Sequence, residues 1–318
     1  MNPFLHGIAL RYFVEVARTG SISDASARLH VAVSAISRQI AKLESELGAP
    51  LFERRPRGMV LSEAGERLLR FAQRSLLEAE HVMKEIGGLD ALHGSLLKIA
   101  CSKGFAIDFL PSAMASFRER HPGVDFALWV GSPVEATRRV RDGDADLALT
   151  FSLAPEKGVR VEHTERAPIL AFMTRNHPLA ARPAVSLADL APYPLALPDV
   201  GSTTVRQLID IVCALDGLLL APVLTTNDTT ATYRFAQRSG AVMLAGLISV
   251  RDLYEADGFV AVPLSNPQLC ERSIQVQTMA GRDLPASVRA FRDHVIAAIA
   301  APDAPAKRRT VSTRRRVR

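Results

Sequence analysis

Residues 24 to 63 read DASARLHVAVSAISRQIAKLESELGAPLFERRPRGMVLSE, a stretch in which an apolar helical repeat is followed by a basic loop. The apolar positions at i, i+4, i+7 and i+11 are Ile36, Ile40, Leu43 and Leu47. Ser34 is a suitable N-cap for this helix, and Gly48 is a suitable residue to end it. The stretch therefore predicts an amphipathic helix with its apolar stripe buried.

Two shorter helices are expected before this one. A first helix has one apolar face, made by Leu10, Phe13, Val14 and Ala17, and ends at Thr19-Gly20. Ser23 can cap a second helix that carries Ala25 and Leu29. His30-Val31 then leaves a turn too short for anything but a sharp helix crossing. The three patterns together predict a helix-turn-helix.

The free face of the third helix suits DNA. Burying its apolar stripe leaves Ser34, Ser37, Arg38 and Lys42 outward, and arginine can hydrogen-bond guanine O6 and N7 in the major groove. An ordinary solvated helix face would look the same. The basic turn around Pro56 favours DNA binding, because it lies where a wing would contact phosphate or the minor groove. The candidate DNA-contacting residues are Ser23, Val33, Ser34, Ser37, Arg38, Lys42, Arg54, Arg55 and Arg57.

The run SAISRQIAKLESELGAPLFERRPRGMVLSEAGE, residues 34 to 66, closely resembles the winged helix-turn-helix of LysR-type transcriptional regulators, and the resemblance extends from about residue 5 to residue 300. It implies that Val33, Ser34, Ser37 and Arg38 face DNA, with Arg38 on a base. Val33 stands where glutamine or proline is usual, so an apolar contact with a thymine methyl is expected there. Ser26 replaces a common alanine, which is a small-for-small change.

A long helix is expected after the wing. Ser62 can cap it, and no proline interrupts it before Gly87-Gly88. One broad stripe runs along it for about 25 residues, or roughly 37 Å. Its members are Gly65, Leu68, Leu69, Ala72, Ser75, Leu76, Ala79, Val82, Met83 and Ile86. The helix could be a core helix of its own domain; pairing with a second copy is favoured, because a dimer brings two recognition helices to half-sites about 34 Å apart.

From residue 95 the pattern alternates between strand and helix, which predicts βαβ units with a parallel sheet. The expected strands are residues 96 to 101, 125 to 130, 146 to 150, 169 to 174, 195 to 197, 223 to 226, 241 to 245, 259 to 263 and 273 to 279. The expected helices are residues 106 to 120, 134 to 142, 204 to 215, 231 to 239 and 285 to 300. The segment resembles a two-lobed periplasmic-binding-protein-like fold, which implies that the final strand and helix return to the first lobe.

The predicted fold is therefore α/β, with an N-terminal winged helix-turn-helix, a long linker helix and a two-lobed effector domain. The expected parts are residues 1–61 (DNA-binding), 62–90 (linker and dimerisation helix), 91–302 (effector-binding) and 303–318 (disordered basic tail). The first lobe takes about 91–164 and 267–302, and the second about 165–266. The tail accounts for the whole net charge of +6. It could add sequence-independent DNA affinity or be a solvated end.

An effector site is expected between the lobes, because ligands of open α/β sheets bind beyond the carboxyl ends of the strands. The residues at these junctions are Ser102, Lys103, Ser132, Thr150, Ser202, Thr203 and Asn227. Each hydroxyl taken alone is more often a helix cap. The resemblance implies that Ser102, Thr150, Ser202 and Thr203 line the effector site. Lys103 favours a small carboxylate-bearing or otherwise anionic metabolite, and no other cofactor or metal is expected.

An enzyme is disfavoured, because no triad, paired carboxylates or metal-ligand spacing emerges. A ligand-blind architectural DNA protein would not need residues 95 to 300. Cys101, Cys213 and Cys270 are too far apart for a metal motif, so buried free thiols are expected. Neither a secretory signal nor a membrane span is visible, which indicates the cytoplasm. The expected partners are operator DNA, a second copy in a homodimer, further copies in a homotetramer, and RNA polymerase.

Overall fold

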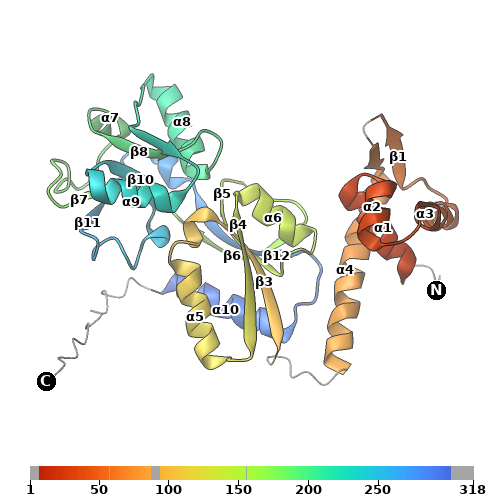
Figure 1. Ribbon diagram of the computed structural model, residues 1–318. Coiled ribbons are helices and arrows are strands. Elements are labelled where there is room, and N and C mark those ends of the chain that lie inside the picture. Colours follow the sequence, from red (N-terminus) through yellow and green to blue (C-terminus); the bar gives the residue numbers. More distant parts are fainter. Residues whose placement is uncertain (1–6, 57, 87–93, 155, 302–318) are drawn as a thin grey trace, which may run out of the picture. The chain divides into compact units, whose positions relative to one another are not determined.

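The computed structural model describes residues 7–56, 58–86, 94–154 and 156–301, which form two compact units (Figure 1). The first unit holds helices α1 to α4 and the hairpin β1-β2. The second holds all the remaining helices and strands of the described chain, arranged around two five-stranded sheets. Residues 87–93 between the units, and the tail expected at 303–318, lie outside the described residues.

The first unit is a winged helix-turn-helix, as predicted. Its elements are α1 (Ile8–Thr19), α2 (Ile22–Leu29), α3 (Val33–Leu47), β1 (Phe52–Arg55) and β2 (Gly58–Leu61). Gly20 and Gly48 end α1 and α3 in the left-handed conformation. Leu10, Phe13 and Ile36 are fully buried in one core that α1, α2 and α3 share. This core holds α3 with its polar face outward.

Two of the predicted helix starts are wrong. Ser21, and not Ser23, caps α2, because its extended backbone lets its hydroxyl accept a hydrogen bond from the Asp24 N–H. Helix α3 begins one residue before Ser34, after Ala32, which has no capping side chain. Leu47, at the last position of α3, is also exposed rather than buried.

Helix α4 (Glu63–Ile86) changes its surroundings along its length. Ser62 caps it by accepting a hydrogen bond from the Gly65 N–H at 3.0 Å. Leu68 and Ala72 are buried in the core of the first unit. Val82 and Met83, farther along, are 49% and 74% exposed. The reading as a core helix therefore holds for the first half of α4, whereas the second half presents apolar side chains that this unit does not cover.

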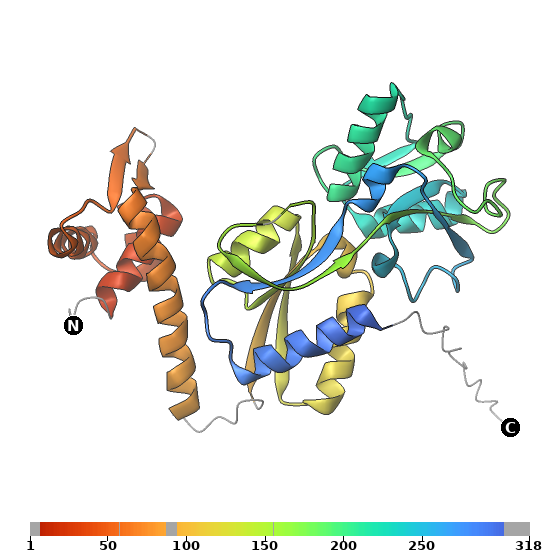
Figure 2. The ribbon, with the colours of Figure 1, turned by 180° about the vertical axis from the view of Figure 1, so that it is seen from behind.

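The first lobe of the second unit has a sheet in the order β4-β3-β5-β12-β6 (Figure 2). Its strands are β3 (Ser95–Ser102), β4 (Val124–Gly131), β5 (Leu147–Ser152), β6 (Val159–Arg166) and β12 (Ser273–Met279). β3, β4 and β5 are parallel as predicted; β12 runs antiparallel to β5, and β6 antiparallel to β12. The expectation of a parallel sheet is wrong for β12, because the returning chain enters the sheet at the edge where β5 ends.

The second lobe has a sheet in the order β11-β7-β10-β8-β9. Its strands are β7 (Ile169–Thr174), β8 (Leu195–Pro198), β9 (Leu224–Thr226), β10 (Val242–Gly246) and β11 (Phe259–Pro263). β10, β8 and β9 are parallel, whereas β7 runs antiparallel to β10 and β11 antiparallel to β7. Both sheets are thus mixed, with three parallel strands on one side and antiparallel pairings on the other.

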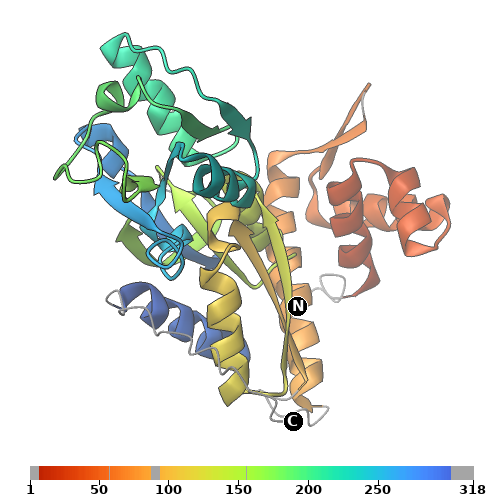
Figure 3. The same ribbon diagram turned by 60° about the vertical axis from the view of Figure 1, so that its left-hand side comes forward.

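Helices cover both faces of each sheet. They are α5 (Phe109–Arg120), α6 (Pro133–Arg141), α7 (Leu187–Leu190), α8 (Thr204–Asp216), α9 (Thr229–Ser239) and α10 (Ala286–Ala300). α10 returns to the first lobe and packs on α5, as Figure 3 shows. α7 and α8 bury one face of the second sheet, and α9 lies in a separate core on the other. Short 3-10 turns follow β3 (Lys103–Phe105) and β10 (Leu247–Ser249) and contact each other across the lobes.

The chain crosses between the lobes at Ala167 and again at Arg272. The Ala167 N–H donates to the Arg272 carbonyl at 2.9 Å, so the two crossing segments lie side by side. β6, which precedes the first crossing, was not predicted; its side chains are mostly exposed and do not alternate clearly. The first lobe extends through Arg166 for this reason.

Candidate functional site

The recognition face of α3 lies on the outside of the first unit. Ser34, Arg38 and Lys42 are exposed, Ser37 is half-buried, and Val33 is 46% exposed at the first helical position. Apolar anchors on the opposite face fix the direction in which these side chains point. The helix thus offers an apolar group, hydroxyls and cations together, which matches what the edges of base pairs present.

The turn before α3 has an unusual backbone. His30 adopts the left-handed conformation with φ of 55°, and the Ser26 hydroxyl donates to the Val31 carbonyl. The Arg28 Nε lies 3.2 Å from the Glu15 carboxylate, which ties α2 to α1. Ser23 is exposed within the first turn of α2. The helices therefore cross at a fixed angle without a glycine in the turn.

The wing is anchored to the end of α1. The Met59 N–H donates to the Gly20 carbonyl at 2.8 Å, and Gly58 has φ of +124°. A Cβ added at Gly58 would lie 2.6 Å from the Gly20 carbonyl oxygen, so no larger residue fits there. Arg55 pairs with Glu53 at 2.9 Å, and both side chains are more than half exposed. The side chain of Arg54 and the whole of Arg57 lie outside the described residues.

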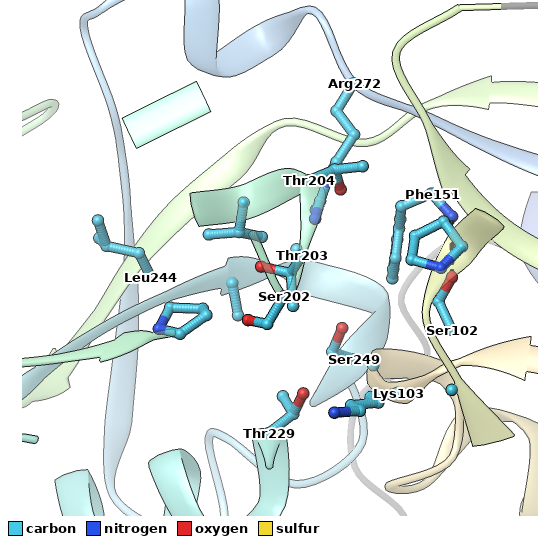
Figure 4. A pocket seen from close by; sticks show the side chains of 17 residues that line it. Ser102, Lys103, Phe151, Ser202, Thr203, Thr204, Thr229, Leu244, Ser249 and Arg272 are labelled. Carbon is cyan, nitrogen blue, oxygen red and sulfur yellow. Dashed lines mark hydrogen bonds between the residues drawn. The ribbon is translucent and has the colours of Figure 1, made fainter. Parts of the chain in front are cut away.

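Two adjoining cavities open between the lobes of the second unit. The first, here called the inner pocket, has a volume of about 40 Å³ and is lined by Ser102, Lys103, Ser202 and Thr203 among others (Figure 4). The second, the outer groove, has about 260 Å³; Ser132 and Thr150 line it. Ser202 and Thr203 line both. Six of the seven residues proposed from the sequence are thus brought together.

The seventh residue, Asn227, lines neither cavity. Its backbone carbonyl accepts a hydrogen bond from the Lys103 ammonium at 2.5 Å. Lys103 follows β3 in the first lobe, and Asn227 follows β9 in the second. The Lys103 ammonium therefore bridges the two lobes at the rim of the inner pocket.

Several of the candidate effector-binding hydroxyls cap helices. The sequence analysis had left this role open as an alternative to ligand binding. Ser132 forms a capping box with Glu135 at the start of α6, and its hydrogen bonds lower the pKa of the Glu135 carboxyl. Thr203 caps α8 by accepting from the Arg206 N–H. Thr150 differs, because its buried hydroxyl has no hydrogen-bond partner in the described part of the chain.

Arg272 lines the inner pocket and was missed by the sequence reasoning. Its guanidinium carbon lies 4.2 Å from the centre of the Phe151 ring. Figure 4 labels both side chains among those that line the inner pocket. Arg272 precedes β12, and Ser273 pairs with Ser152 at the end of β5. An antiparallel strand brings its first residues to the edge where parallel strands end. Local sequence pattern does not encode that direction, so it gave no signal for Arg272.

The described residues hold no group of three or more metal-ligating side chains. His163, His177 and His294 lie outside both interlobe cavities, and burial lowers the pKa values of His177 and His294. No helix in the described residues is both long and apolar enough to cross a membrane.

The cysteines are free thiols. Cys101 is buried as expected, and burial raises its pKa to about 12. Cys213 is half-buried and Cys270 is exposed, so the expectation of burial is wrong for these two.

Comparison with known proteins finds relatives for nearly the whole chain. Residues 8–66 match the family described as bacterial regulatory helix-turn-helix protein, lysR family, and residues 91–300 match the LysR substrate binding domain. The transcriptional dual regulator GltC of Bacillus subtilis is 32% identical over 295 residues, which is 90% of this chain and 95% of GltC.

Solved structures share the fold. A full-length OxyR variant from Pseudomonas aeruginosa has a TM-score of 0.62 at 21% identity, with 91% of this chain and 95% of that chain covered. Full-length CbnR in a complex with its target DNA has a TM-score of 0.52 at 21% identity, with 91% and 98% covered.

Proposed function

The chain belongs to the LysR family of transcriptional regulators, and we propose that it binds operator DNA as a homodimer in response to a small anionic effector held between its lobes. The observation that supports DNA binding is the exposed face of α3, on which Arg38 points outward beside the anchored wing. The relative CbnR was solved on its target DNA. The cytoplasm, where the operator is, is the proposed place of action.

The second half of α4 supports the dimer. Val82 and Met83 are consecutive apolar residues that are exposed, and both belong to the predicted stripe, which suits a seam between two copies of the helix. A two-fold dimer presents two α3 helices to two half-sites, as an operator with inverted repeats requires. Further assembly to a homotetramer and contact with RNA polymerase belong to the same proposal.

The interlobe cavities support the proposed binding of an effector. Ser102, Thr150 and Ser202 reach them from both lobes, so a ligand there would contact each lobe at once. A ligand that binds one arrangement of the lobes more tightly shifts the protein toward it. The binding of operator DNA would then depend on effector concentration.

The test is operator binding by Arg38→Ala in a gel-shift titration on DNA from the chain's own promoter region. We expect specific binding to weaken by about 1 to 3 kcal/mol, with relaxed preference at one base pair. Arg138→Ala removes the same charge from an exposed position on α6 and should leave both unchanged. Equal affinity and equal base preference in Arg38→Ala would contradict the assignment of α3.

A further inference from the structure

Arg272 is a buried charge that the protein itself does not neutralise. Its side chain is only 2% exposed. The Nε atom donates to the Ala167 carbonyl at 3.1 Å, but the Nη2 atom has no hydrogen-bond partner among the described residues. Within that same part of the chain no carboxylate forms an ion pair with Arg272. One edge of the guanidinium is therefore bonded to the protein, and another lines the inner pocket.

The guanidinium stays charged at neutral pH in spite of its burial. Loss of hydration lowers its pKa to about 9, which is still well above 7. An isolated buried charge is costly unless a partner compensates it. A buried arginine donor therefore points to an acceptor with negative charge.

A helix N-terminus lies at the same pocket as Arg272. Gly246 leaves room for the guanidinium itself, because a Cβ added there would lie 2.2 Å from Nη2. Thr204 and Val205, in the first turn of α8, line the same pocket. The first N–H groups of a helix lack intrahelical partners, and the helix dipole is positive at this end. The Arg272 guanidinium and the N-terminus of α8 therefore both place positive potential in the inner pocket.

Lys103 also lines the inner pocket; one of its three ammonium N–H groups donates to the Asn227 carbonyl across the lobes, and its charge adds to the positive potential there. The size of the space limits the ligand further. About 40 Å³ holds roughly three water molecules, or one carboxylate group, by the volume a single water needs. The outer groove shares Phe151 and Thr204 with the inner pocket and has room for the rest of a small metabolite.

We propose that Arg272 binds the carboxylate of the effector, and that the effector is a compact organic carboxylate with its charged end in the inner pocket and its body along the outer groove. The carboxylate accepts hydrogen bonds from Arg272 Nη2 and from the first turn of α8. Arginine suits carboxylate because its donors form a planar fork. This inference rests on the proposed function and deepens it.

The position of Arg272 links the ligand to the hinge. Arg272 and Ala167 are the residues at which the chain passes between the lobes, and each donates to the carbonyl of the other. α8 belongs to the second lobe, so a carboxylate held by Arg272 and α8 would join the hinge to that lobe.

The test measures the melting temperature of the full-length protein with propionate, benzoate or succinate, each at the same millimolar concentration and ionic strength. The neutral amides propionamide and benzamide, and inorganic phosphate, are the controls. We expect at least one carboxylate to raise the melting temperature while its amide does not. Arg272→Met should abolish this rise, and Arg272→Lys should retain part of it.

Arg139→Met is the matched control. Arg139 also stacks on an aromatic ring, with its guanidinium carbon 4.4 Å from the centre of Trp129, and its buried Nε lacks a partner among the described residues. It lines neither interlobe cavity. The rise caused by carboxylate should be the same in Arg139→Met as in the unchanged protein.

The proposal is overturned if no carboxylate acts in the unchanged protein, if amides or phosphate act equally, or if the rise persists in Arg272→Met. Operator binding by gel shift shows that each variant is folded and separates the two proposals. If operator binding responds to an anionic compound equally in Arg272→Met and in the unchanged protein, the proposed function is kept and the role of Arg272 is refuted.

Discussion

Thr150→Val should make the second unit, which contains both lobes, more stable. The Thr150 side chain is 1% exposed, and its hydroxyl has no partner among the described residues. A buried hydroxyl without a hydrogen bond costs about 1 to 3 kcal/mol, and valine replaces it with a methyl group of similar shape. For a unit of this size each 1 kcal/mol moves the melting temperature by about 2 to 4 °C. Differential scanning calorimetry should therefore show a rise of a few degrees.

Thr137→Val is the matched control with the opposite sign. Thr137 is equally buried, but its hydroxyl donates to Gln277 Oε1 at 2.8 Å. The change would leave that amide oxygen buried without its donor, at a cost of about 1 to 3 kcal/mol. If Thr150→Val lowered the melting temperature as much as Thr137→Val, the Thr150 hydroxyl would have a partner in solution, and the reasoning would be refuted.

The remaining predictions concern the DNA-binding unit and the thiols. Arg55→Ala should weaken binding to all sequences and reduce the slope of log K against log salt by about one, as a fluorescence titration over several salt concentrations would show. Gly58→Ala should disorder the wing and reduce operator binding without changing the melting of the second unit; an unchanged gel shift would contradict this. Met83→Glu should dissociate the dimer, and light scattering that still found a dimer would place the seam elsewhere. Cys270 should react with a thiol reagent in the folded protein, whereas Cys101 should react only after unfolding, because burial raises its pKa to about 12.

The helical stripes could be predicted from the sequence because burial depends on spacing. Leu10 and Ile36 are fully buried as their positions required. Helix starts were less predictable, since Ser21 and Ser23 are both good caps and the choice depends on which one has an extended backbone. Leu47 follows the stripe but lies in the last turn of α3, beyond the core that would bury it.

The residues that line the interlobe cavities were predictable at one end of the strands only. Ser102, Thr150 and Ser202 were found by assuming that parallel strands end in the cleft. Arg272 was missed because it begins a strand, and whether a strand runs parallel or antiparallel depends on long-range pairing that local pattern does not encode. The strand-end rule therefore found Lys103 but missed Arg272, the buried cation of the inner pocket.

Because the chain crosses between the lobes twice, the first lobe can be completed only after the second lobe has been synthesised. The second lobe is one continuous stretch, so it can close while synthesis continues. β5 can pair with β12 only after β12 has been synthesised, because Ser152 pairs with Ser273, which lies 121 residues later. At about 5 to 20 residues per second this delay is roughly 6 to 24 seconds, during which one edge of β5 is unpaired. A chain released before β12 is made would keep that edge open to a neighbouring strand, although its DNA-binding unit would already be folded.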